Sequence, residues 1–195
     1  MGIQIGQKPS PTFQQPLELL SDCHRRIENF LRALVLVTEQ AKGGALDERE
    51  REALQTALRD FREAAPKHTA DEEESLFPRM RTLDPAGAHE ALEKIQRLEK
   101  DHVTANRGHE LVEQIGKKWL RDNKLSGPDV ELLSITLRNL QEIYARHIEV
   151  EDKEIFPFAA KVLDGKQLAD VGREMAERRG QEFIPSWDRP KLSKS

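Results

Sequence analysis

The chain has 195 residues, with 31 Lys and Arg against 35 Asp and Glu, six His and one Cys. This length favours a single domain, and a formal net charge of -4 argues against a general nucleic-acid-binding surface. A lone Cys excludes an intramolecular disulfide, and no apolar run approaches the roughly 20 residues of a transmembrane helix. We therefore expect a cytoplasmic protein that binds neither nucleic acid nor a membrane, in an oligomeric state that the sequence leaves open.

Helical periodicity runs through most of the chain, and no stretch alternates in the manner of a strand. Prolines make residues 1–16 a poor helix, so an extended N-terminal arm is expected there. The predicted helices span 17–42, about 47 to 78, from the turn at 83–87 to just before 126, and from there to about 157. Residues 17–163 should form an all-α, antiparallel four-helix bundle, and residues 164–195 a shorter helix and a tail that packs on the bundle or trails from it.

The second and fourth predicted helices repeat one another at an offset of 79 residues. The shared features are a His, a Glu four residues later and an aliphatic-Phe-Pro ending: His68, Glu72 and residues 76–78 in the second helix, and His147, Glu151 and residues 155–157 in the fourth. His24 and His102 extend the repeat to the first and third helices, with a separation of 78 residues. The chain therefore looks like a duplicated helical hairpin.

The repeated His-x3-Glu motif points to a metal site. A lone His on an apolar stripe is more often a core residue, but a His and a Glu one turn apart share a helix face and can bind one ion. A buried Glu costs several kcal/mol unless it is paired or metal-bound. Residues at one level of an antiparallel hairpin are equidistant from its turn, and this test brings all the candidates within about one turn, or 5 Å. The predicted ligands are four imidazoles and two carboxylates: His24, His68, Glu72, His102, His147 and Glu151.

The order of these residues resembles the hemerythrin-like (HHE cation-binding) family over about residues 17–160. The resemblance implies an up-down-up-down bundle around a non-haem di-iron centre. Glu72 and Glu151 would bridge the two Fe ions together with an oxo or hydroxo group, and the histidines would be terminal ligands. The imidazole and carboxylate set itself could also bind Zn or Mn.

One departure from the family pattern bears on function. Oxygen-carrying members have a further His one turn after the third-helix ligand, where this chain has Asn106. The resemblance then implies an extra open coordination position, as in members associated with the repair of iron centres under nitrosative and oxidative stress. We therefore expect a centre that binds or reacts with O2, NO or peroxide in stress response or iron homeostasis, and an electron-donor protein as a partner.

Two alternatives stay open at this point. One is an iron-responsive regulatory or storage module, and the other is a structural bundle whose site is vestigial or filled by zinc. The sequence contains no second cofactor motif, such as a glycine-rich dinucleotide loop or a haem-attachment motif. Whether the protein is an enzyme is therefore left open as well.

Four further side chains flank the predicted site. His109 lies two turns beyond the third-helix candidate, about 10 Å along the axis, and is expected beside the site rather than in it. Asp152 is the main rival of Glu151, although Asp152 and Glu73 are more typical of solvated faces or of partners of the ligands. Tyr144 could donate a hydrogen bond to a bridging ligand or simply fill the core.

Overall fold

The computed structural model describes residues 11–82 and 85–183, apart from the side chains of 85–87. Within these residues it contains helices and no strand, which confirms the predicted all-α class. Most of the predicted N-terminal arm, and the tail beyond residue 183, lie outside the described residues. No described helix combines the length and the hydropathy that crossing a membrane would require.

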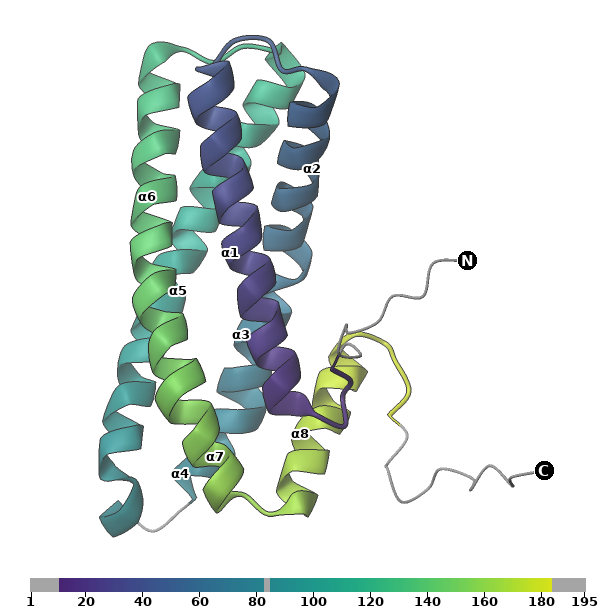
Figure 1. Ribbon diagram of the computed structural model, residues 1–195, viewed down its shortest axis with the longest axis vertical. Helices are drawn as coiled ribbons and strands as arrows, with labels where there is room; N and C mark the ends of the chain where they lie inside the picture. Colours follow the sequence, from purple (N-terminus) through teal and green to yellow (C-terminus); the bar gives the residue numbers. More distant parts are fainter. Residues whose placement is uncertain (1–10, 83–84, 184–195) are drawn as a thin grey trace, which may run out of the picture.

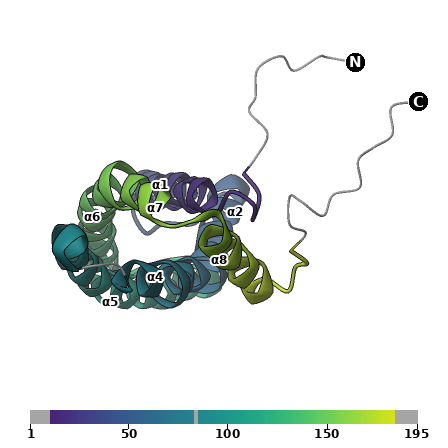
Figure 2. The same ribbon diagram turned by 90° about the horizontal axis from the view of Figure 1, so that it is seen from below.

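In the part of the chain that the structure describes, four long helical segments of alternating direction form the bundle, and a fifth helix packs on it (Figure 1). In chain order the elements are α1 (Pro16–Ala41); α2 (Glu48–Glu63), α3 (Ala65–Ala70), η1 (Asp71–Leu76) and α4 (Phe77–Arg81); α5 (Pro85–Asp122); α6 (Gly127–Val150), η2 (Glu151–Ile155) and α7 (Phe156–Val162); and α8 (Gly165–Arg178). α1 and α5 each pack against both α2 and α6, so the four segments enclose one core, as the end-on view shows (Figure 2). The up-down-up-down prediction is confirmed.

The helix starts and the turns follow local sequence signals. The side chains of Asp47, Ser126 and Asp164 accept hydrogen bonds from the third residue of α2, α6 and α8, and each of these helices begins with a capping box. α1 ends at a left-handed turn in which Gly43 has φ 77°, and a Cβ on Gly43 would lie 2.4 Å from the Val130 side chain. These signals explain why the predicted boundaries lie close to the observed ones.

The second and fourth segments contain a feature that the periodicity does not predict. Each has a π-helical turn, η1 and η2, directly before Phe-Pro, and the amide of Phe77 or Phe156 donates to the carbonyl of Glu72 or Glu151 five residues earlier. The following proline has no N–H, and its ring would clash with a carbonyl in a regular α-helix, so a wider turn relieves both problems. The two glutamates of the repeat, Glu72 and Glu151, therefore each lie in a π turn.

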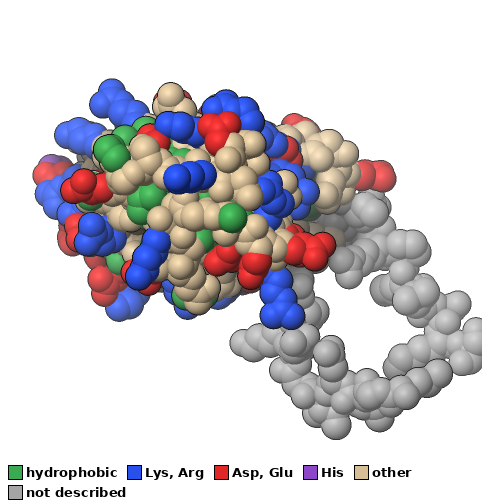
Figure 3. Space-filling model, turned by 90° about the horizontal axis from the view of Figure 1, so that it is seen from above, with side chains coloured by type: hydrophobic (Ala, Val, Ile, Leu, Met, Phe, Trp, Pro, Cys, Tyr) green, Lys and Arg blue, Asp and Glu red, His purple; other side chains and the backbone are tan. Residues whose placement is uncertain are grey.

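One polar layer divides the core into two apolar parts. The larger part lies toward the end of the bundle where α1 joins α2, and contains Phe61 and Trp119; the smaller lies toward α7 and α8, and contains Phe77 and Met80. Between them lie buried His and Glu side chains. On the outer surface at the larger end, basic and acidic side chains are interspersed (Figure 3). The polar layer is thus the chemically distinctive part of the interior.

Candidate metal centre

The structure brings all six predicted ligands together in this layer. They come from α1, α3, η1, α5, α6 and η2, and none is more than 8% exposed. Their ligand atoms form two groups of four, each with all its atoms within 4.8 Å of one another. The first ligand group is His24, His68, Glu72 and Glu151, and the second is Glu72, His102, His147 and Glu151. Both groups therefore share the same two carboxylates, while each takes its imidazoles from one hairpin of the repeat.

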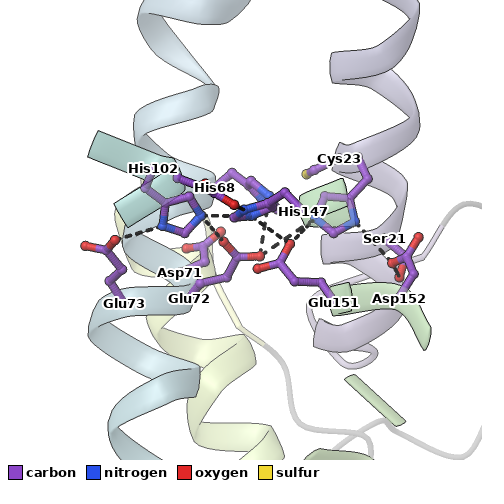
Figure 4. A network of polar contacts seen from close by, with 12 residues as sticks. Ser21, Cys23, His68, Asp71, Glu72, Glu73, His102, His147, Glu151 and Asp152 are labelled. Carbon is purple, nitrogen blue, oxygen red and sulfur yellow. Dashed lines mark hydrogen bonds and ion pairs between the residues drawn. The ribbon is translucent and has the colours of Figure 1, made fainter. Parts of the chain in front are cut away.

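Each shared carboxylate lies between imidazoles of both hairpins (Figure 4). One oxygen of Glu72 is 3.4 Å from His68 Nε2, and the other is 3.2 Å from His102 Nε2. Oε2 of Glu151 is 3.0 Å and 3.1 Å from the Nε2 atoms of the α1 and α6 histidines. All four imidazoles thus direct Nε2 toward the carboxylates.

The bonding state of these atoms fits a pair of cations. Both oxygens of Glu72 and of Glu151 are buried, and the only groups within pairing distance of them among the described residues are the imidazoles of the layer. A buried carboxylate carries a large desolvation cost, which a metal ion bound by the carboxylate and the imidazoles offsets. Nε2 of His102 also lies 3.1 Å from Nε2 of His147, so two nitrogens converge on the same space. Imidazole nitrogens and carboxylate oxygens in this arrangement suit iron, zinc or manganese.

Without metal, the charges of the layer balance through protons. Burial opposes protonation of His24, but hydrogen bonds to Asp152 and Glu151 outweigh it and raise the pKa of His24 well above its ordinary value. For His102, burial is likewise outweighed by Glu72, and the pKa rises to about 9. Burial would raise the pKa of Glu72, yet the surrounding imidazoles hold that pKa well below its usual range. Metal binding would therefore release protons from the imidazoles.

Two further carboxylates hold the outer nitrogens of two imidazoles. Glu73 Oε1 lies 2.8 Å from His102 Nδ1, and Asp152 Oδ1 lies 3.1 Å from His24 Nδ1 and accepts a hydrogen bond of 2.6 Å from the Ser21 hydroxyl. Glu73 and Asp152 are 79 residues apart, and each reaches from its own hairpin to an imidazole of the other. Asp152 belongs to neither ligand group, whereas its rival Glu151 belongs to both, so the structure places Glu151 at the centre. The outer carboxylates fix the ring orientation that points Nε2 inward.

We expect Glu73→Ala and Asp152→Ala each to weaken metal binding by roughly 10- to 100-fold, the usual effect of losing the partner of a metal-bound imidazole. Competition against a chelator of known affinity measures this change. Glu73→Gln keeps an acceptor oxygen and should recover part of the loss. The matched control is Glu149→Gln, because that side chain is exposed and pairs with Lys153 on its own helix. Equal affinities in the alanine variants and the control would contradict the assignment.

The contribution of α8 to the site is not among the sequence predictions. Asp71, adjacent to Glu72, is fully buried, and its oxygens accept hydrogen bonds of 2.9 Å from Arg178 and 2.6 Å from Arg179. Burial raises the pKa of Asp71, and the two guanidinium groups oppose that rise. The available signal was the repeat itself, because the position that corresponds to Asp71 is Val150. An acidic side chain in one half of the repeat, where the other half has Val, indicates that Asp71 pairs with a basic residue outside the repeat.

His109 and Tyr144 form a separate buried pair beside the ligands. His109 belongs to neither ligand group, and its Nε2 lies 3.2 Å from the Tyr144 hydroxyl. Burial lowers the pKa of His109 to about 4 and raises the pKa of Tyr144. The imidazole is therefore neutral, and Tyr144 donates the hydrogen bond. This hydroxyl is directed to His109 rather than to the shared carboxylates.

The low pKa of His109 predicts a pH-dependent contribution to stability. The unfolded chain protonates this imidazole near pH 6.5, whereas the folded protein keeps it neutral down to about pH 4. Unfolding thus takes up a proton between these pH values. The free energy of unfolding therefore decreases as the pH is lowered below about 6.5, and the loss reaches roughly 2 kcal/mol at about pH 5. Urea unfolding of the metal-free protein at several pH values measures this slope. His109→Phe should flatten it, and an unchanged slope would contradict the prediction.

A pocket of about 440 Å³ opens beside the second ligand group. Its wall includes Thr69, Glu73, His102, Asn106, His109 and Tyr144. Asn106 thus lines open space at the position where a further His would lie in an oxygen-carrying pattern. The pocket gives a small molecule a route to the metal-binding layer.

Comparisons with known proteins agree with this geometry. Residues 15–159 match the sequence model of a family described as "Hemerythrin HHE cation binding domain". The chain is also 26% identical over 176 residues to an uncharacterized protein of Haemophilus influenzae, an alignment that covers 86% of this chain and 92% of that protein. The family match contains all six residues of the two ligand groups.

Proposed function

Because this chain belongs to the hemerythrin HHE cation-binding family, we propose that its two ligand groups hold two non-haem iron ions that bind or react with O2, NO or peroxide. One observation carries the proposal: Glu72 and Glu151 belong to both ligand groups. Two cations held by the same two carboxylates form a binuclear centre. Each cation would also receive two imidazoles, and a mixed imidazole and carboxylate set suits non-haem iron.

The protein's own groups would position the ions and admit the ligand. The apolar parts of the core on either side of the layer exclude bulk water, and the pocket beside His102 admits small molecules. Asn106 cannot supply a further imidazole ligand on the side of the pocket. A coordination position would therefore stay open there, which favours reaction with O2 over its simple storage. When bound, the iron ions would supply electrons to O2, NO or peroxide. An electron-donor protein in the cytoplasm would restore them, in stress response or iron homeostasis.

The test is anaerobic purification followed by metal analysis and ultraviolet-visible spectroscopy before and after addition of O2, peroxide or NO. We expect about two iron ions per chain, an oxo-to-iron charge-transfer band after oxidation and a separate spectral change with NO. Zinc in place of iron, with no spectral change after iron reconstitution, would contradict the proposal. A folded protein that takes up no metal would contradict it as well.

The contacts of α8 favour a second candidate, a metal-responsive module. Arg178 and Arg179 bind Asp71, which is adjacent to the shared ligand Glu72, so metal occupancy and α8 docking act on the same π turn. Chelation should then lower the melting temperature and speed hydrogen exchange in α8. If chelation changes neither quantity, this second function is wrong.

A further inference from the structure

We propose that Tyr144 and His109 form a one-electron relay beside the metal centre: Tyr144 gives an electron toward the second ligand group while its hydroxyl proton passes to Nε2 of His109. The inference rests on the proposed function, because it needs an oxidant at the metals. It assigns a chemical role to a buried pair that lies outside both ligand groups.

The proton acceptor is held in place. Tyr144 and His109 are each only 7% exposed, their rings are within 13° of parallel, and the hydroxyl lies 3.2 Å from Nε2. Phe61 also stacks on the imidazole, with ring centroids 4.4 Å apart and an angle of 10°. The imidazole is thus held by contacts with two aromatic rings, with one nitrogen directed at the phenol. This is the geometry that a proton transfer coupled to tyrosine oxidation requires.

On the side of the electron acceptor, Tyr144 lies against a candidate ligand. The Tyr144 ring contacts the His147 ring at an angle of 72°, with centroids 6.2 Å apart, and His147 belongs to the second ligand group. The phenol therefore contacts a candidate metal ligand directly. In the other half of the repeat the corresponding residue is Ala65, so only one side of the centre has this arrangement. Tyr144 and His109 also line the pocket, where a small one-electron reductant could restore the phenol.

The step balances with peroxide as the oxidant. Reduction of one peroxide to two waters consumes two electrons and two protons. One electron would come from the reduced metal pair and one from Tyr144, and the two protons would be taken up from the buffer, so that no hydroxide is left over. Tyr144 loses its hydroxyl proton to His109, which leaves a neutral tyrosyl radical and an imidazolium. Return of one electron to Tyr144 and of the proton from His109 restores the pair.

The composition makes the experiment specific, because Tyr144 is the single tyrosine of the chain. The first test uses the metal-free protein and a flash-generated ruthenium(III) polypyridyl oxidant, with tyrosyl radical formation followed by transient absorption. We expect a hydrogen isotope effect in wild type and a rate about 100-fold lower in His109→Phe, in line with the loss of a positioned base. His109→Phe keeps an aromatic ring against Phe61, and Tyr144→Phe is the zero-signal control. Equal rates in wild type and His109→Phe would overturn the proposal.

The second test uses protein reconstituted with iron, reduced, and mixed with hydrogen peroxide. We expect a tyrosyl radical by freeze-quench electron paramagnetic resonance in wild type, a weaker one in His109→Phe and none in Tyr144→Phe. Iron that binds and is oxidised by peroxide without any tyrosyl radical would overturn the relay while leaving the proposed function intact. A protein that takes up no iron would instead refute the proposed function, and the flash experiment would still decide whether the pair moves a proton and an electron together.

Discussion

Replacement of either shared carboxylate, by Glu72→Gln or Glu151→Gln, is expected to abolish the binding of both metal ions. Each carboxylate belongs to both ligand groups, and neither has another hydrogen-bond partner among the described residues. Loss of a direct ligand should weaken binding by more than roughly 100-fold, since even partners of ligands contribute about 10- to 100-fold. Titration with Fe(II) or Zn(II), read by calorimetry and metal analysis, measures affinity and stoichiometry. Circular dichroism checks that each variant is folded.

A histidine variant gives the matched contrast. His68 belongs to the first ligand group alone, so His68→Gln should weaken one ion far more than the other. The exposed Glu149→Gln should leave both ions in place. If Glu72→Gln and Glu151→Gln each lose a single ion, as His68→Gln does, the carboxylates do not bridge and the binuclear assignment is wrong.

The second large effect is expected in α8. Arg178→Met with Arg179→Met leaves the buried carboxylate of Asp71 without its cationic partners, a change that costs about 3–5 kcal/mol when a buried ion pair is broken. Part of this cost is relieved if α8 detaches from η1. We therefore expect a lower free energy of unfolding in urea and faster hydrogen exchange in α8. Asp71→Leu on the same background should recover most of the loss, because no unpaired charge is then buried.

The control for this prediction lies on the same helix. Arg173 is about half exposed and pairs with Glu177 and Asp170 of α8 itself. Arg173→Met should therefore change the free energy of unfolding by less than about 1 kcal/mol, as expected for exposed ion pairs. A double variant no less stable than Arg173→Met would mean that the buried Asp71 cluster does not hold α8 in place.

Metal binding should depend on the two outer carboxylates as well as on the six candidate ligands. Glu73 and Asp152 each orient an imidazole of the opposite hairpin. The two hairpins therefore complete one another at the centre as well as in the core. Stability of the bundle and affinity for metal should be linked, because separation of the hairpins breaks both sets of contacts.

The sequence alone determined the helices, the duplicated hairpin and the six candidate ligands. Helical periodicity places His68 beside Glu72, and His147 beside Glu151, on one face, and the short turns between antiparallel helices fix their levels. The predicted set is therefore a consequence of local geometry and of symmetry between the halves. The structure then brings all six side chains to one layer, although metal ligation itself stays a prediction.

Only the tertiary structure decided which groups lie at the centre and which support it. Glu151 and its neighbour Asp152 open a π turn, and a change of turn width is not visible in apolar periodicity. The contacts of Asp71 with α8 and of Tyr144 with His109 join residues that no repeat relates and whose separations in sequence are long. Periodicity reports which face of a helix is buried; which side chain meets which across that interface depends on how the helices pack together.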